Sequence, residues 1–353
     1  MRIAWLAFVC AMLVACSLFA PAPSPTHEPE FVIPTPSPKP SVTATTFTGH
    51  YGFLVPSASG FAIRRENDTT VLGTIDASIG AVSPDGRYFA GWSQQAPWEL
   101  RVIEVAKPTA IQKVLALDAT ERPLGVVWSV DETGLLFSVA SLETSGAGIS
   151  APPKYSALRS VDLASVKITE RARGDATWLR PALWDRVGGD LVGAFSVTPG
   201  AAIGYVVVRG NGQPERRPFA SSTTWQETPA VDGEGGWVAV ASLTDPIVKT
   251  FLASDPGFSL EYHGNAGGAS AAGRPMSTQN AIVVDGEFLL WDARAGSRIR
   301  VGTVNDLRGV RFFRFDGSAA VVTTANGLGL LDMATGMLTA LTGGQPWFAV
   351  ALP

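Results

Sequence analysis

Short runs of apolar residues alternate with clusters of turn-forming residues from about residue 50 to the end of the chain. The clearest case is the sequence GAVSPDGRYFAGW at residues 80–92, in which two apolar segments flank a central turn. Pro84 presets the backbone angle φ for a turn, Asp85 can accept hydrogen bonds from its own backbone, and Gly86 tolerates a positive φ. The pattern therefore predicts a β-hairpin whose two strands lie inside a core.

Weaker copies of this hairpin recur along the chain, and the last copy shows how many strands each one has. Residues 305–343 contain four apolar segments separated by three turn sequences, each with a glycine: Gly317, Gly327 and Gly336. The second of these turns contains an Asn-Gly pair between apolar runs, which is a strong hairpin signal. We therefore expect a four-stranded antiparallel sheet here.

The spacing of the inner turns predicts the architecture. Their aspartates at positions 85, 131, 185 and 232 follow one another at intervals of roughly 46–54 residues. A period of about 40–45 residues, lengthened by loops, is typical of four-stranded β-propeller blades. Six blades are predicted in this way, at residues 78–118, 119–173, 174–221, 222–265, 266–304 and 305–343.

Two pieces remain outside these six blades, namely three strands within residues 50–76 and one strand at residues 347–352. Together they make a seventh blade, because an open ring would leave two unpaired strand edges. The predicted fold is therefore an all-β, seven-bladed β-propeller that is closed between the N-terminal and C-terminal strands.

The Ser-Pro-Asp-Gly sequence at residues 83–86 resembles the repeat of TolB-type β-propellers, which carry this turn between the first two strands of a blade. Residues 131–134 and 316–318 are degenerate copies of the same turn. In architecture the resemblance covers most of residues 50–353. It implies a periplasmic or secreted protein, but it implies no activity, because one fold supports many functions.

The N-terminal segment differs in composition from the repeats. Arg2 precedes an uncharged apolar run at residues 3–15, which is too short for a transmembrane helix and is typical of a signal peptide. The run ends in Leu-Val-Ala-Cys at residues 13–16, which resembles the lipobox of bacterial lipoproteins. That resemblance implies cleavage before Cys16 and lipid attachment to its thiol. An ordinary secretory signal cleaved a few residues later is the alternative.

The predicted organisation has three parts: a lipoprotein signal peptide at residues 1–15, a Pro/Ser/Thr-rich tether at 16–46 and the β-propeller at 47–353. A Pro-rich segment of this kind is extended and semi-rigid, as expected of a spacer. The predicted location is outside the cytoplasm, in the bacterial cell envelope. The membrane is the predicted partner, through the lipid on Cys16.

Composition excludes several classes of function. The net charge is −4 and charged residues make up 16% of the chain, so nucleic acid is not a predicted partner. Cys10 and Cys16 are the only cysteines, so the propeller has neither a disulfide nor a thiolate metal site. The histidines lack metal-ligand spacing, and no Gly-x-Ser-x-Gly sequence occurs. We therefore predict no catalytic residue, no cofactor and no metal, and a protein that is not an enzyme.

One set of polar and aromatic residues forms the candidate binding site. In a propeller the loops that lead into the innermost strands gather at one mouth of the central channel, and tryptophans with arginines are typical of binding hot spots. The predicted ligand-binding residues are Arg122, Trp178, Arg180, Trp225, Gln226, Glu227, Arg274, Asp306 and Arg308. The alternative is structural, with tryptophans that pack between blades and arginines that brace neighbouring loops.

These observations favour a lipid-anchored binding propeller that recognises a peptide, a glycan or a protein partner at the channel mouth. One alternative is an enzyme at the same mouth, such as a lyase or a lactonase. The other is a purely structural scaffold of the envelope. Converging carboxylates or histidines would favour the enzyme, whereas an aromatic-rich mouth would favour the binding module.

Overall fold

The computed structural model describes residues 47, 49–146, 151–185, 190–196, 204–210, 212–218, 224–226, 229–233, 236–252, 259–265, 267–304, 307–342 and 344–353. All of these residues belong to one compact unit, Pro36–Pro353. Within the described ranges the regular secondary structure consists of β-strands. None of these residues belongs to a helix with the length and apolar character that crossing a membrane requires.

The strands form seven four-stranded sheets, which we number as blades. Blade 1 contains β28 (Phe348–Leu352), β1 (His50–Ser57), β2 (Gly60–Arg65) and β3 (Val71–Ile75). Blade 2 contains β4 (Ile79–Val82), β5 (Tyr88–Trp92), β6 (Glu99–Glu104) and β7 (Ile111–Ala116). Blade 3 contains β8 (Glu121–Trp128), β9 (Gly134–Ser141), β10 (Tyr155–Asp162) and β11 (Ile168–Asp175).

The remaining blades have the same antiparallel order. Blade 4 contains β12 (Trp178–Asp185), β13 (Asp190–Ser196), β14 (Gly204–Val208) and β15 (Glu215–Pro218). Blade 5 contains β16 (Ala230–Val231), β17 (Trp237–Ala241), β18 (Ile247–Leu252) and β19 (Ser259–His263). Blade 6 contains β20 (Ser270–Gly273), β21 (Gln279–Val284), β22 (Glu287–Asp292) and β23 (Ser297–Arg300). Blade 7 contains β24 (Gly309–Phe313), β25 (Ala319–Thr324), β26 (Gly327–Asp332) and β27 (Leu338–Ala340).

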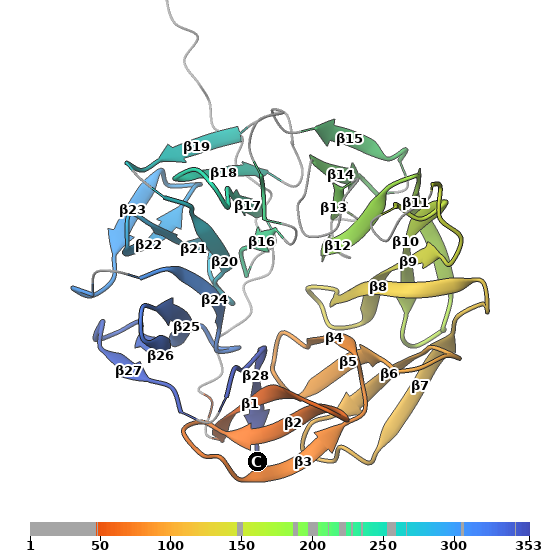
Figure 1. The fold of residues 1–353 in the computed structure, drawn as a ribbon, viewed down its shortest axis with the longest axis horizontal. Helices are drawn as coiled ribbons and strands as arrows, with labels where there is room; N and C mark the ends of the chain where they lie inside the picture. The colour runs from red at the N-terminus through yellow and green to blue at the C-terminus, as the bar shows by residue number, and fades with distance from the viewer. Residues whose placement is uncertain are drawn as a thin grey trace, which may run out of the picture. The chain divides into compact units, whose positions relative to one another are not determined.

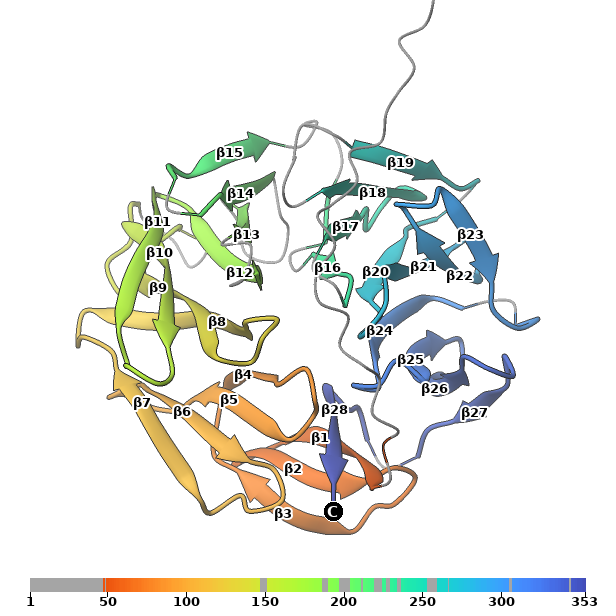
Figure 2. The same cartoon turned by 180° about the vertical axis from the view of Figure 1, so that it is seen from behind.

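The blades follow one another around a ring, with the first strand of each sheet at the axis (Figure 1 and, from behind, Figure 2). Around the axis the innermost strands run β28, β4, β8, β12, β16, β20 and β24, and each of them contacts the next. The prediction of a seven-bladed β-propeller closed between the N-terminal and C-terminal strands is therefore confirmed. The predicted blade limits hold to within a few residues; for example, β11 runs to Asp175, past the predicted limit at 173.

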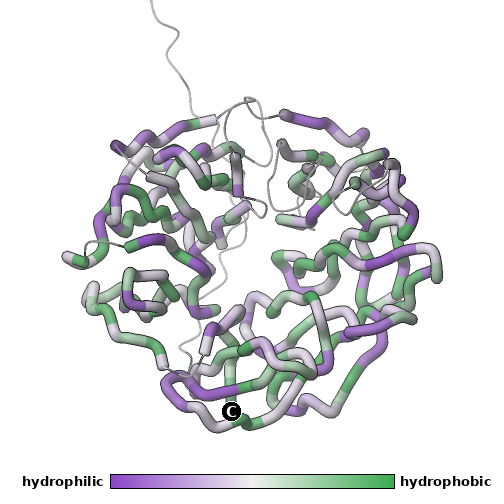
Figure 3. The backbone as a smooth tube through the Cα atoms, viewed as in Figure 1, coloured by the Kyte–Doolittle hydropathy of each residue, from purple (hydrophilic) through white to green (hydrophobic). Residues whose placement is uncertain are grey.

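Apolar side chains from facing sheets fill the seams between blades. In the seam between blades 2 and 3, the rings of Trp92 and Phe137 meet edge to face with centroids 5.6 Å apart. Five tryptophans within the strands are buried: Trp92, Trp128, Trp184, Trp237 and Trp291. Hydrophilic residues instead mark outermost strands such as β15 and β19 (Figure 3). The core is thus a series of radial layers.

Local side-chain hydrogen bonds set the inner turns. In blade 2 the Ser83 hydroxyl donates to Asp85 Oδ1 at 2.6 Å, and Gly86 has a φ of +78°. The third blade repeats the same pair, because Ser129 Oγ donates to Asp131 Oδ1 at 2.7 Å. That copy has lost the proline and the glycine of the first. The Ser–Asp pair is therefore retained in the degenerate copy of blade 3.

The ring closes through β28, which pairs with β1 in antiparallel register from Leu54↔Phe348 to His50↔Leu352. A second tie holds β28 to the neighbouring blade, since its Ala351 N–H donates to the carbonyl oxygen of residue 86 at 2.9 Å. The C-terminal strand thus bridges blades 1 and 2 and supplies the strand that blade 1 lacks.

Trp347 differs from its predicted place inside this strand. It precedes β28, and its side chain is 48% exposed, although its backbone N–H donates to Leu54 O at 2.9 Å. Its ring contacts Phe61 at a centroid distance of 5.8 Å. The residue lies where the strand emerges from the seam, so its backbone is paired while its ring stays half in solvent.

Deleting residues 345–353 should open the ring. The deletion removes Val350 and Leu352, which are 0% and 5% exposed, and leaves the edge of β1 unpaired. Burying large apolar side chains contributes about 1.5–3 kcal/mol each, against a typical total stability of about 5–15 kcal/mol. We expect loss of cooperative thermal unfolding, measured by circular dichroism.

The matched control is Met337→Ser, because that side chain is 66% exposed and its replacement should leave the unfolding curve nearly unchanged. A truncated protein that melts cooperatively at the wild-type temperature would show that β28 does not close the ring.

Stability should depend on pH through the inner turn of blade 2. Burial on its own raises the pKa of Asp85, but hydrogen bonds from Ser83 and Arg87 outweigh it and leave the pKa below its ordinary value. The contribution of Asp85 to the free energy of unfolding is thus complete above the unfolded-state pKa of about 3.9. It is lost as pH falls through the lower folded-state pKa.

We expect Asp85→Ala to lower the free energy of unfolding by about 1–3 kcal/mol at pH 7 and by less below pH 4, in urea titrations at each pH. Asp76→Ala serves as the control, since Asp76 makes only an exposed ion pair with Arg101. A loss of stability that is equal at both pH values would contradict this account of the turn.

Candidate functional site

The two ends of the ring carry different connections. The bottom face carries the inner turns, such as residues 83–87, where an innermost strand leads into the second strand. The top face carries the segments that lead into the innermost strands, and also the connections between second and third strands, such as residues 93–98. The mouth at which the binding site was predicted is the top face.

Three predicted site residues meet at the top of the seam between blades 3 and 4. The guanidinium carbon of Arg122 lies 5.0 Å from the centroid of the Trp178 ring. Arg180 donates from Nη1 to the carbonyl oxygen of Leu124 on the adjacent innermost strand. Trp178 is only 8% exposed, whereas both arginines are partly exposed. The tryptophan therefore offers little surface to a ligand, and the two arginines hold the seam while reaching solvent.

Two more predicted residues brace neighbouring blades. Trp225 is 5% exposed and packs between blades 4 and 5. Gln226 bonds both backbone groups of Ala271 on β20, donating from Nε2 to its oxygen at 3.3 Å and accepting from its N–H at 3.4 Å. The predicted site residues Glu227 and Asp306 lie outside the described residues.

The prediction that Arg274 lies at the same mouth is wrong. Arg274 follows β20 in the inner turn to β21, so it lies at the bottom face. Its Nε donates to Gly317 O at 3.3 Å and its Nη1 to Gln279 Oε1 at 2.7 Å, and burial lowers the pKa of the guanidinium. The error arose because β20 is short and ends at Gly273, which moves the next residue past the strand and into the turn.

Arg308 lines a groove of about 730 Å³ in the top face, which we call the top-face groove. Its walls are the chain before β20, the turn between β21 and β22, the segment before β24 and the turn between β25 and β26. Its inner end approaches the axis, because Arg308 directly precedes the innermost strand β24 and Gly268 lies two residues before the innermost strand β20. Its size is within the range of about 300–1,000 Å³ that is usual for small-molecule sites.

Asp285 supplies a carboxylate to this groove, and the sequence interpretation missed it. Asp285 and Gly286 have φ angles of +54° and +77°, as expected for a two-residue type I′ hairpin turn. Both carboxylate oxygens accept the backbone N–H of Asn265, at 2.8 and 2.9 Å, and Oδ2 also accepts its Nδ2 at 3.0 Å. These bonds orient an exposed carboxylate at the rim of the groove. An Asp-Gly pair between two apolar runs was the signal in the sequence.

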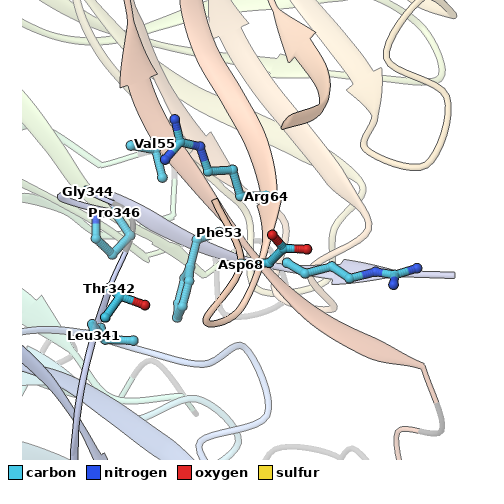
Figure 4. Close-up of a pocket in the computed structure, with 9 residues that line it drawn as sticks. Phe53, Val55, Arg64, Asp68, Leu341, Thr342, Gly344 and Pro346 are labelled. Atoms are coloured by element: carbon cyan, nitrogen blue, oxygen red, sulfur yellow. The ribbon is translucent and has the colours of Figure 1, made fainter. Parts of the chain in front are cut away.

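Two other hollows are less suited to a substrate. The cavity in Figure 4, between Phe53 and Gly344, measures about 10 Å³, which is room for about one water molecule. A side groove of about 340 Å³ has Glu121 at its floor, where its carboxylate accepts both terminal nitrogens of Arg159 at 2.7 Å. Burial, and then a hydrogen bond to Glu121, raises the pKa of Tyr155 in the same cluster. That carboxylate is fully engaged in bracing β8 against β10.

The described residues contain no group of three or more His, Cys, Asp and Glu side chains placed to hold a metal ion. The fold and the top-face groove together define a seven-bladed β-propeller with a ligand-sized site beside its axis.

Comparisons with known proteins agree with this class. No family model matches the chain, and no curated protein matches it. The periplasmic gluconolactonase of Pseudomonas aeruginosa is similar, with 14% identity over 86% of this chain and 99% of that one and a TM-score of 0.55. A Bacteroides fragilis protein provisionally assigned as a 6-phosphogluconolactonase has 10% identity over 87% and 99%, again with a TM-score of 0.55. An oligogalacturonate lyase from Vibrio parahaemolyticus has 13% identity over 72% and 76%, with a TM-score of 0.49.

These neighbours contradict two of our predictions, namely that the propeller is a non-enzymatic binding module and that the chain is not an enzyme. The two structures with TM-scores of 0.55 are named, in one case provisionally, as lactonases, and this is the finding that stands against both predictions. None of the three is named as a TolB-type protein. At 10–14% identity such a likeness establishes a shared fold, and the chemistry has to come from this chain's own residues.

Proposed function

We propose that this protein is a lactonase-like hydrolase that opens a cyclic ester in the top-face groove. Two observations support the proposal. The two neighbours with TM-scores of 0.55 are named as a gluconolactonase and, provisionally, a 6-phosphogluconolactonase. The chain's own groove contains a carboxylate and a guanidinium, on Asp285 and Arg308. The second observation carries the proposal, because it belongs to this molecule.

The two groups suit the two needs of ester hydrolysis. Asp285 accepts a proton from a water molecule as the water oxygen bonds to the ring carbonyl carbon. The Arg308 guanidinium stabilises the negative charge that develops on the carbonyl oxygen. The ring C–O bond then breaks, the leaving oxygen takes the proton back from Asp285, and a hydroxy acid is released. The hydrogen bonds from Asn265 hold the carboxylate in position throughout.

Replacing the carboxylate should abolish the reaction without unfolding the turn. Asparagine tolerates the positive φ of residue 285. Loss of a general base typically lowers the rate by about 10²–10⁴. We therefore expect Asp285→Asn to lower kcat by that factor in pH-stat assays on a panel of sugar lactones, corrected for spontaneous hydrolysis.

The control is Asp118→Asn, an exposed aspartate of the β7–β8 connection whose carboxylate accepts the N–H of Thr120 at 2.9 Å. It should leave kcat unchanged. Equal activity of Asp285→Asn and wild type would refute the assignment of Asp285 as the base.

The proposal includes the cellular location. The Leu-Val-Ala-Cys sequence at residues 13–16 supports lipid attachment at Cys16, with residues 1–15 as the signal peptide and 16–46 as the tether. The TolB-like turn at residues 83–86 supports a place outside the cytoplasm. Two acyl chains on one residue give a stable membrane anchor, whereas a single chain does not.

Cys16→Ala should remove the lipid. We expect metabolic labelling with a radioactive fatty acid to mark the wild-type protein and to leave the variant unlabelled and uncleaved. Cys10→Ala is the matched control, since Cys10 lies within the apolar run and should not affect labelling. Equal labelling of wild type and Cys16→Ala would contradict the anchor.

A further inference from the structure

Arg311 occupies an unusual place on its innermost strand. In the ladder between β24 and β25, Val310 pairs with Val322 and Phe312 pairs with Val321, so Arg311 is the extra residue of a β-bulge. A bulge redirects the side chain that it contains. The side chain of Arg311 therefore does not follow the alternation by which its neighbours point to one face of the sheet and then to the other.

The packing of the neighbouring residues determines where Arg311 points. Val310 and Phe313 belong to the apolar cluster against blade 6, and Phe312 packs against the cluster shared with blade 1. Both faces of the sheet are thus covered at this level. Arg311 is nevertheless exposed, and on an innermost strand the side that the two packed faces leave open is the one toward the ring axis.

Two arginines are placed here, Arg308 directly before β24 and Arg311 within it. Within the described part of the chain, neither Arg308 nor Arg311 makes a side-chain hydrogen bond or an ion pair. Other arginines of the same molecule do: Arg314 Nε donates to Glu66 at 2.9 Å, and Arg159 is held by Glu121. The charge of Arg311 is therefore available to a ligand. Within the described residues, no polar contact of the Arg311 side chain accounts for the bulge that exposes it.

The opposite side of the axis carries charge of the same sign. Arg122 and Arg180 lie on β8 and β12, each two residues before a bulge of its own strand, at Leu124 and Ala182. The acidic side chain of this region, Glu121, is turned into its blade and bonded to Arg159. Among the described residues, innermost strands on both sides of the axis therefore carry arginines, although the whole protein has a net charge of −4.

We propose that Arg311 binds an anionic group of the substrate, a carboxylate or a phosphate that is remote from the lactone ring, so that the substrate class is an acidic sugar lactone. This inference rests on the proposed function, because it places the ring in the top-face groove and the anion at the axis. Arg311 is then a specificity residue, with Arg122 and Arg180 adding positive potential across the axis.

The test compares three lactones with the full-length protein in detergent: a neutral aldonolactone, the same lactone with a 6-phosphate, and an aldarolactone with a terminal carboxylate. We expect kcat/KM to be about tenfold or more higher for the acidic lactones, with the difference in KM. The two acidic arms separate phosphate from carboxylate preference. The advantage should shrink as salt rises, because screening weakens exposed charge pairs.

Arg311→Gln should remove that preference, and Arg311→Lys should keep part of it, because lysine retains the charge without the planar fork. Arg65→Gln is the matched control, an exposed arginine on β2 in blade 1 that should leave the preference intact. A wild-type protein that hydrolyses neutral and acidic lactones equally well would overturn the inference while leaving the proposed function standing.

If no lactone is hydrolysed, the proposed function fails and the anion site is tested by binding alone. Calorimetry with 6-phosphogluconate then decides. Binding that Arg311→Gln weakens about tenfold or more, and that Arg65→Gln leaves intact, supports the anion site. Absent binding, or binding equal in wild type and Arg311→Gln, overturns it.

Discussion

The pairing of β28 with β1 is the constraint on which the rest of the structure depends. It joins the two ends of the ring. Because β28 pairs with β1 from Leu54↔Phe348 to His50↔Leu352, the inner edge of β1 is not left unpaired. Side chains at the bottom face reinforce it, since the Tyr51 hydroxyl donates to Asp316 of blade 7. Burial, followed by this bond, raises the pKa of Tyr51. Blades 6 and 7, whose loops form the top-face groove, are themselves held together by a shared apolar cluster.

Within the closed ring, polar side chains tie several innermost strands to their neighbours at the level of the top face. Ser270 Oγ accepts the N–H of Val310 at 2.8 Å, Gln226 bonds both backbone groups of Ala271, and Arg180 reaches Leu124 O. Such bonds satisfy backbone N–H and C=O groups that the strand ladders leave unbonded. A backbone group without a partner would cost free energy in a buried seam. The rigid frame they make is what positions the unbonded groups, Arg308 and Arg311, beside the axis.

The fold could be predicted well from the sequence because local residue patterns determine the structure of each blade. The Ser–Asp turn and its degenerate copy are set by residues two apart, and seam tryptophans such as Trp92 lie in plain apolar runs. The candidate site depends on which loops meet in space, and there local patterns failed. Trp178 and Trp225 looked like ligand contacts but lie in seams, and Arg274 fell on the opposite face because one strand is short. Asp285 looked like an ordinary turn residue, and it is one, but its turn borders the groove.

Net charge was the least informative property for the ligand. A value of −4 describes the field far from the surface, where it disfavours large polyanions such as nucleic acid. A small anion that enters the top face instead comes within about one Debye length, roughly 8–10 Å, of the axial arginines, and the local sign then decides. Arg122, Arg180 and Arg311 lie on innermost strands, whereas the Glu121 carboxylate is bonded to Arg159. A protein of net charge −4 can therefore still present a cationic site to a small anion, because its charges are distributed by blade position.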